Sequence, residues 1–124
     1  GVTSQASILT RAITTPLALA ASKITGADPT LTSAISLFTG IIGASIGSKV
    51  LRMQGVEDDV SVGIATGAAA HSLGAASVAS NPVRFASAVV AMCLTGVWTV
   101  VLLSIPQARV VLLRLAAQPA LPLL

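Results

Sequence analysis

The chain has 124 residues, of which 54% are hydrophobic and only 9% carry a charge. Seven basic and four acidic side chains are too few to coat a soluble globule of this length, whereas a helix bundle in lipid needs charge only in its loops. The composition therefore excludes an ordinary soluble domain and a disordered chain. The net charge of +3 does not indicate nucleic-acid binding, because the basic residues are scattered and lack interleaved aromatic side chains.

Long stretches without Lys, Arg, Asp or Glu mark the candidate membrane spans, because ionisable groups are costly in hydrocarbon. Residues 29–48, 60–83 and 85–108 are such stretches, and each is long enough to cross a hydrocarbon layer of about 30 Å. Residues 12–22 form a fourth stretch that is too short to cross. We therefore expect an all-α, polytopic transmembrane helix bundle with about three full spans plus one broken or re-entrant half-helix.

The short stretch carries the signals of a half-helix that points inward. Pro16 suits a first helical turn with Thr15 as its N-cap, and Gly26 supplies a stop about ten residues later. Such a helix is about 15 Å long. A short element before a full span is typical of re-entrant or broken helices.

The first full span is expected to begin at Asp28 and Pro29, which repeat the cap-and-start pattern. Gly43 and Gly47 within it form a small-xxx-small pair that indicates close helix packing. After it comes the one charged cluster, which we interpret as solvated capping of two helix dipoles: Lys49, Arg52, Glu57, Asp58 and Asp59.

The stretch over 60–83 has few large apolar residues, so we expect it in the middle of the bundle. Gly63, Gly67, His71 and Gly74 follow at spacings of four, four and three, which place them on one face of a continuous helix. The single histidine would then lie in a groove of glycines that another backbone or a ligand can approach. The glycines are equally explained by packing alone.

Asn81 and Pro82 are expected to end that stretch and start the next. Residues 85–108 are hydrophobic enough to face lipid on the outside of the bundle. Cys93 stands alone in this apolar run and is expected to be buried and inert. With three spans, one side of the membrane would carry Arg11, Lys23 and Arg84 and the other Lys49, Arg52, Arg109 and Arg114. That division gives no orientation.

The chain is not expected to be an enzyme. One histidine, with all four acids outside the uncharged stretches, forms no catalytic triad, no metal site and no phosphate-binding loop, so no cofactor or metal is implied. Two features indicate binding of a small anion. The N-terminus of the half-helix at Thr14, Thr15 and Pro16 offers free N–H groups and a positive dipole end. His71 can bond a hydroxyl or carboxylate, although it can equally bond only a neighbouring carbonyl.

Three motifs carry a resemblance to a known family. They are Arg11-Ala-Ile-Thr-Thr-Pro-Leu-Ala18, the start at Leu31-Thr-Ser-Ala34 followed by Thr39-Gly-Ile-Ile-Gly43, and Gly67-Ala-Ala-Ala-His-Ser-Leu-Gly74. Over about residues 10–116 the chain resembles the C-terminal part of the LrgB-like membrane proteins. The ending, with Leu94-Thr-Gly96 and Ser104-Ile-Pro106, is similar to the plastid branch. Arg11 departs from the resemblance, which implies a lysine there.

The resemblance implies a carrier of the chloroplast inner envelope that exchanges glycolate for glycerate, two small 2-hydroxymonocarboxylates. Carried over by position, Thr14, Thr15 and Pro16 match the family's broken helix, and Gly67, His71 and Gly74 match its central helix. These six residues are the expected substrate-binding set. The alternative is a holin/antiholin-like protein of the bacterial plasma membrane, which would regulate murein hydrolase export and lysis without moving solute.

We expect residues 1–116 to be the C-terminal part of an LrgB-like transmembrane domain and residues 117–124 to be a frayed tail. Expected partners are a small carboxylate, the lipid bilayer and missing N-terminal helices of the same protein, and homo-oligomer formation stays open. An alternative for residues 1–22 is a transit peptide, since they hold hydroxyls and Arg11 but no acid.

Overall fold

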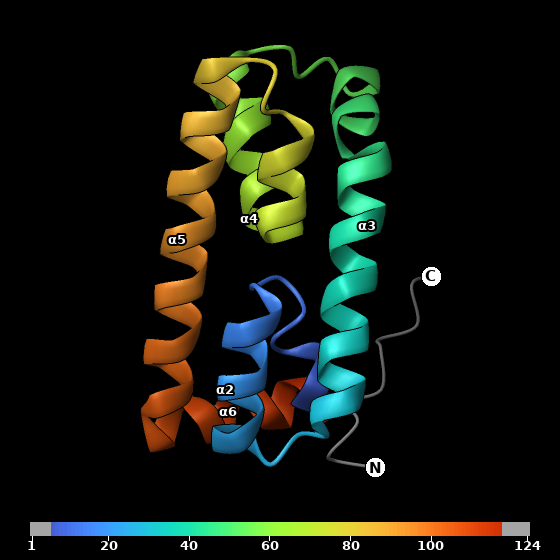
Figure 1. The fold of residues 1–124 in the computed structure, drawn as a ribbon. Coiled ribbons are helices and arrows are strands. Elements are labelled where there is room, and N and C mark those ends of the chain that lie inside the picture. Colours follow the sequence, from blue (N-terminus) through green and yellow to red (C-terminus); the bar gives the residue numbers. More distant parts are fainter. Residues whose placement is uncertain (1–5, 118–124) are drawn as a thin grey trace, which may run out of the picture.

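The computed structural model describes residues 6–117, and every regular element among them is helical. A short helical turn over residues 6–8 is followed by five helices (Figure 1). They are α2 (Thr15–Thr25), α3 (Pro29–Met53), α4 (Asp59–Ser77), α5 (Pro82–Ser104) and α6 (Pro106–Ala117). The expected all-α class is confirmed. Of the expected frayed tail, residues 118–124 lie outside the described residues.

Two helices run the full height of the molecule. α3 has 25 residues and α5 has 23, and among the described residues these are the helices long and apolar enough to cross a membrane. Asp28 caps α3 by accepting the Leu31 N–H at 2.7 Å, and Asn81 caps α5 by accepting the Val83 N–H at 3.0 Å. Both helices turn large apolar side chains outward, including Phe38, Ile42, Ile46, Val90, Leu94 and Trp98.

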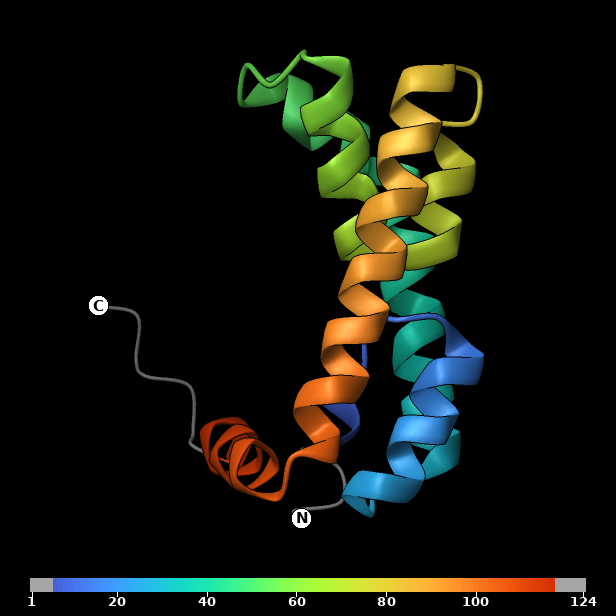
Figure 2. The same cartoon turned by 90° about the vertical axis from the view of Figure 1, so that its left-hand side faces the viewer.

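α4 lies between these two helices, as expected for the middle of the bundle, but it does not cross. Its backbone leaves the helical conformation at Ala70 (φ −126°, ψ 16°) and His71 (φ 44°, ψ −135°). The chain then doubles back, so that α5 starts at the end where α4 began (Figures 1 and 2). The Asp59 carboxylate accepts hydrogen bonds from Asn81 at 3.0 Å and Arg84 at 2.6 Å. A straight helix would hold Asp59 and Asn81 about 33 Å apart.

The prediction of a full span over 60–83 is therefore wrong, and this segment is a re-entrant hairpin. The two arms lie against each other because Gly74 has no side chain: a Cβ there would overlap the Thr66 carbonyl oxygen. Val62 on the first arm packs with Ala75 and Val78 beyond the break. The four residues expected on one helical face are split between the two arms and the break.

The N-terminal segment forms a second re-entrant hairpin, which enters from the opposite end. Residues 6–13 rise to mid-height and α2 returns beside them (Figure 1). The predicted half-helix is present, with Gly26 in the left-handed conformation at its end (φ 71°). Its N-cap is Thr14 rather than the predicted Thr15, and the Thr14 side chain makes no capping hydrogen bond.

α6 lies crosswise at the end where α2 finishes, and Arg109 donates to the Ile24 carbonyl oxygen at 3.2 Å. Since α4 doubles back, the predicted division of basic residues between the two sides is also wrong. Arg84 lies at the same end as Lys49 and Arg52, whereas Arg109 and Arg114 lie at the end of Lys23. The two ends still carry no charge bias that would set an orientation.

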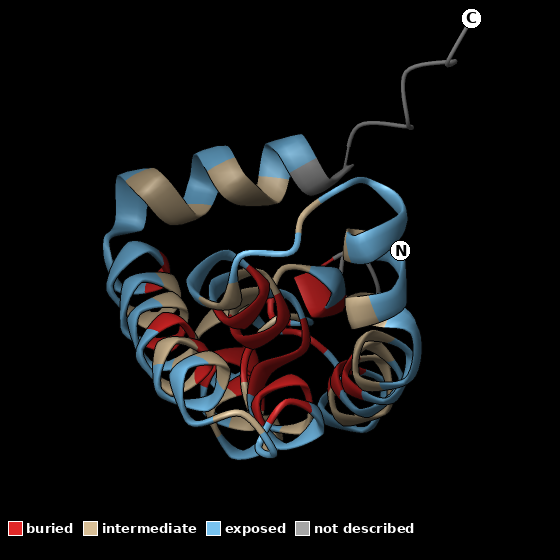
Figure 3. Ribbon diagram, turned by 90° about the horizontal axis from the view of Figure 1, so that it is seen from above, coloured by how far each residue is buried: buried red, intermediate tan, exposed pale blue. Residues whose placement is uncertain are grey.

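Seen along the bundle, the buried residues gather in the centre, where α2, α4 and the inner faces of α3 and α5 meet (Figure 3). The inner face of α3 is polar and small, with Thr32, Ser36 and Gly40 spaced one turn apart. These residues bring α3 close to the tips of both hairpins.

Candidate functional site

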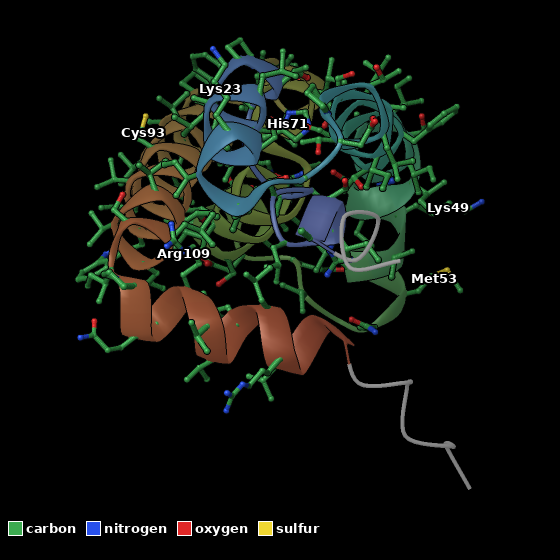
Figure 4. The ribbon with its side chains drawn as sticks, turned by 90° about the horizontal axis from the view of Figure 1, so that it is seen from below. Lys23, Lys49, Met53, His71, Cys93 and Arg109 are labelled. Carbon is green, nitrogen blue, oxygen red and sulfur yellow. The ribbon has the colours of Figure 1, made fainter. Side chains whose placement is uncertain are left out.

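The tips of the two hairpins are joined through one residue of α3. Nε2 of His71 lies 2.9 Å from the Ser36 carbonyl oxygen, and the Ser36 hydroxyl donates to the Ile13 carbonyl oxygen at 2.8 Å. Ile13 closes the first hairpin and His71 closes the second. All three residues are at most 2% exposed. In Figure 4 His71 lies inside the ring of helices, while Lys49, Met53 and Cys93 project outward.

Both ring nitrogens of His71 have a hydrogen-bond partner. A carbonyl oxygen can only accept, so Nε2 carries a proton and donates to Ser36. Nδ1 lies 3.3 Å from the Ser72 hydroxyl, which can donate to it. This is the carbonyl-bonded arrangement that the sequence left open beside ligand binding.

The backbone at His71 is strained. Among the described residues it is the one non-glycine residue with positive φ, a conformation that costs about 1–3 kcal/mol and is usually found at binding or switching sites. Gly40 on α3 makes room for the ring, because a Cβ there would lie 2.5 Å from Cε1 of His71. Tertiary contacts thus hold this strained turn in place.

The sequence analysis missed Ser36 and Gly40. The sequence does contain a pattern that could have identified them. Thr32, Ser36 and Gly40 are spaced four residues apart within a hydrophobic span, and this spacing places small and polar groups on one helical face. Which groups they would meet is not visible in the sequence, since Ile13 and His71 lie 23 and 35 residues away from Ser36.

The predicted glycines are close-approach positions, and protein backbone fills the approach. A Cβ at Gly67 would overlap the Ala88 carbonyl oxygen of α5, and one at Gly63 would overlap the Arg84 carbonyl oxygen. A Cβ at Gly43 would likewise overlap the Cβ of Ala70 on α4. Helix packing, the interpretation already preferred for Gly43, is what these contacts show.

The three residues at the start of α2 lie at the tip of the first hairpin. Thr14 and Thr15 are half-buried and Pro16 is exposed. Thr14 borders a cavity of about 490 Å³ whose other lining residues come from α2 and α5 and are apolar, among them Leu17, Met92 and Val97. Cys93 also lines it and is exposed, so the expectation of a buried thiol is wrong.

The acidic cluster lies outside the spanning helices and has a structural role. Hydrogen bonds from Arg84 and then Asn81 lower the pKa of Asp59 below its ordinary value of 3.8. The pKa of Asp58 is lowered because it accepts the Ser61 N–H at the start of α4. Both carboxylates are therefore charged throughout the neutral range, and the Asp59–Arg84 pair fastens the open end of the second hairpin.

Among residues 6–117 no three His, Cys, Asp or Glu side chains come together as metal ligands. The site consists instead of hydroxyls, one imidazole, helix ends and closely packed small residues. Two helices long and apolar enough to cross a membrane fit the class of helical integral membrane proteins, and the broken backbone at Ala70 and His71 is buried in protein, as such backbone must be at membrane depth.

Within that class, the chain belongs to the LrgB-like family, whose sequence pattern matches residues 2–107. It is 39% identical over 105 residues to plastidal glycolate/glycerate translocator 1 of Arabidopsis thaliana, a match covering 83% of this chain and 20% of that protein. It is 35% identical over 98 residues to antiholin-like protein LrgB of Bacillus mycoides, covering 78% of this chain and 43% of that protein. An antiholin-like protein LrgB of Bacillus cereus matches equally well.

The chain therefore spans less than half the length of these relatives. Their names describe a translocator and antiholin-like proteins, not enzymes. No solved structure matches the fold.

Proposed function

We propose that this chain forms the substrate-handling part of a secondary carrier for small 2-hydroxymonocarboxylates of the glycolate and glycerate type. The observation that carries the proposal is the meeting of two re-entrant hairpins, which enter from opposite ends and join at Ser36. Carriers commonly place their substrate site where discontinuous helices meet near the middle of the bilayer. The translocator from Arabidopsis thaliana, 39% identical, supports the substrate class.

The start of α2 supplies the expected attraction for a carboxylate. Thr14, Thr15 and Pro16 stand at a helix N-terminus inside the bundle, where the unpaired N–H groups and the helix dipole favour negative charge. His71 lies on the facing tip, with Gly67 and Gly74 allowing its hairpin to pack tightly.

The joint at Ser36 gives the carrier a part that can open. Separating the tips breaks two hydrogen bonds, His71 to Ser36 and Ser36 to Ile13. A substrate that supplies equivalent hydrogen bonds would offset that loss and favour the separated state. Transport would be driven by counter-exchange or by a proton, which the His71 imidazole would carry among the described residues.

The chloroplast inner envelope and a requirement for further helices of the same protein are part of this proposal. The outward apolar faces of α3 and α5 would meet lipid, such helices or a second copy of the chain.

The test is uptake of labelled glycolate by the complete gene product in liposomes. Thr15→Val and His71→Ala are expected to reduce the initial rate at least tenfold each. Ser45→Ala is the matched control, because Ser45 is exposed on α3 and bonds only the Ile41 carbonyl of its own helix. Normal rates in both site variants would contradict the proposed site.

The second candidate is an antiholin-like interaction protein, favoured by the 35% identity to the Bacillus proteins of that name. In that case the joined tips would be purely structural and the exposed faces of α3 and α5 would contact a protein partner. A complete gene product that alters murein hydrolase activity but moves no carboxylate would favour it over the carrier.

A further inference from the structure

A cavity of about 600 Å³ lies where the first hairpin, α3 and the first arm of α4 come together. Its walls are mostly small or apolar and hold one charged side chain. The lining residues are Arg11, Ala12, Thr39, Ile42, Gly43, Ala65, Ala68 and Ala69.

Among residues 6–117 no acidic side chain pairs with Arg11 in this cavity. The Arg11 side chain is exposed, and the ion pair found among the described residues joins Arg84 to Asp59 instead. Within residues 6–117 the carboxylates all lie beyond the ends of α3 or at the start of α4, in the loops around Asp28 and Glu57–Asp59. No hydrogen bond joins the Arg11 guanidinium or the Thr39 hydroxyl to another described residue.

The position of Arg11 makes this unusual. Its cavity neighbours Thr39, Ile42 and Gly43 belong to the middle of α3, a helix long enough to span a membrane. A guanidinium at that depth is costly unless an anion or water accompanies it, and intramembrane charges of this kind mark substrate pathways.

We propose that Arg11 binds the carboxylate of the transported anion and that Thr39 bonds its 2-hydroxyl group. A guanidinium presents a planar fork that matches a carboxylate through two parallel hydrogen bonds. The Thr39 hydroxyl both donates and accepts, as a substrate hydroxyl requires. Ala65, Ala68 and Ala69 leave room for a molecule of a few carbon atoms and add no competing polar group. This inference rests on the proposed function: Arg11 forms the direct ion pair with the carboxylate, and the nearby start of α2 adds only the favourable field of its helix dipole.

The experiment compares concentration-dependent uptake by the complete gene product in liposomes. Arg11→Gln is expected to raise the KM for glycolate at least tenfold. Arg11→Lys keeps the positive charge and is expected to raise this KM less. Arg52→Gln is the matched control, because Arg52 is an exposed cation near the end of α3 and its removal is expected to leave KM unchanged.

Thr39→Val tests the hydroxyl contact separately. It is expected to raise the KM for glycolate several-fold and to leave that for acetate, which lacks the 2-hydroxyl, unchanged. Equal effects on both acids would overturn the role of Thr39.

The outcomes separate the two proposals. Absence of uptake by the unmodified protein contradicts the proposed function itself. Uptake with an unchanged KM in Arg11→Gln overturns the assignment of Arg11 and leaves the carrier standing. If Arg11 instead pairs with an acid elsewhere in the gene product, Arg11→Gln lowers the thermal midpoint with KM unchanged, which also overturns it. Should Arg11→Gln fail to fold, a glycolate-dependent rise in the midpoint of Arg11→Lys supports the assignment, and no rise overturns it.

Discussion

Ser36 is a small residue that forms hydrogen bonds to both hairpins. Its side chain and its main chain serve different hairpins, because the hydroxyl donates to Ile13 while the carbonyl accepts from His71. Neither bond belongs to the helix ladder of α3. The hydroxyl of Thr32, one turn earlier, is fully buried with no partner among the described atoms.

At this scale we predict that Thr32→Val stabilises the protein. Valine has nearly the same shape, and removing a buried hydroxyl without a partner recovers about 1–3 kcal/mol of desolvation cost. The measurement is the thermal midpoint of the purified protein in detergent, which should rise. A falling midpoint would mean that the hydroxyl has a partner in the rest of the protein.

Ser36→Ala is the opposite case and serves as its comparison. It leaves the Ile13 carbonyl oxygen buried and unpaired, so the thermal midpoint should fall by about as much as Thr32→Val raises it. An unchanged midpoint would contradict the role given to Ser36 as the joint.

Among the elements, α4 relies on three glycines for close packing. Gly63 and Gly67 let it lie against the backbone of α5, and Gly74 lets its second arm lie against the first. Without a hydrophobic driving force between helices in lipid, such close backbone contact supplies much of the association energy.

We predict that Gly67→Ala separates α4 from α5, because the added Cβ overlaps the Ala88 carbonyl oxygen, which belongs to a rigid helix. Overpacking of this kind costs about 1–3 kcal/mol. Gly47→Ala is the matched control, since the nearest atom to its Cβ is Cγ2 of Thr66 at an ordinary 3.8 Å. Thermal midpoints in detergent should fall for Gly67→Ala and stay level or rise for Gly47→Ala. Equal effects would contradict the packing described.

For the whole molecule, the decisive feature is that two segments turn back at mid-height from opposite ends (Figures 1 and 2). The loop before α4 and the loop before α5 therefore lie on the same side. The loop before α3 lies on the other side, together with α6.

This topology predicts a labelling pattern. In a Cys93→Ser background, single cysteines at Gln54 and Ser80 should react with an impermeant maleimide from the same side of sealed vesicles, and one at the exposed Thr30, at the start of α3, from the other. Gln54 and Ser80 are exposed, which favours reaction. If Gln54 and Ser80 react from opposite sides, α4 crosses the membrane and the re-entrant description is wrong.

The sequence alone determined the local features of this protein. Scarcity of charge predicted helices in lipid, and the signals at Gly26, Asp28 and Asn81 placed helix ends correctly because capping acts within a turn. The inward half-helix was recognised for the same reason, although its cap lies at Thr14. The motifs around Thr14 and His71 were enough to place the chain in its family.

Only the tertiary structure decided that residues 60–83 turn back. From Val60 to Asn81 the sequence contains no proline and no charged residue, so the local pattern is that of a continuous helix. The break at His71 is held by contacts distant in sequence, from His71 to Ser36 and from Asp59 to Arg84. Such contacts outweigh helix propensity, which amounts to less than about 1 kcal/mol per residue, and they also bring Arg11 to the cavity beside Thr39.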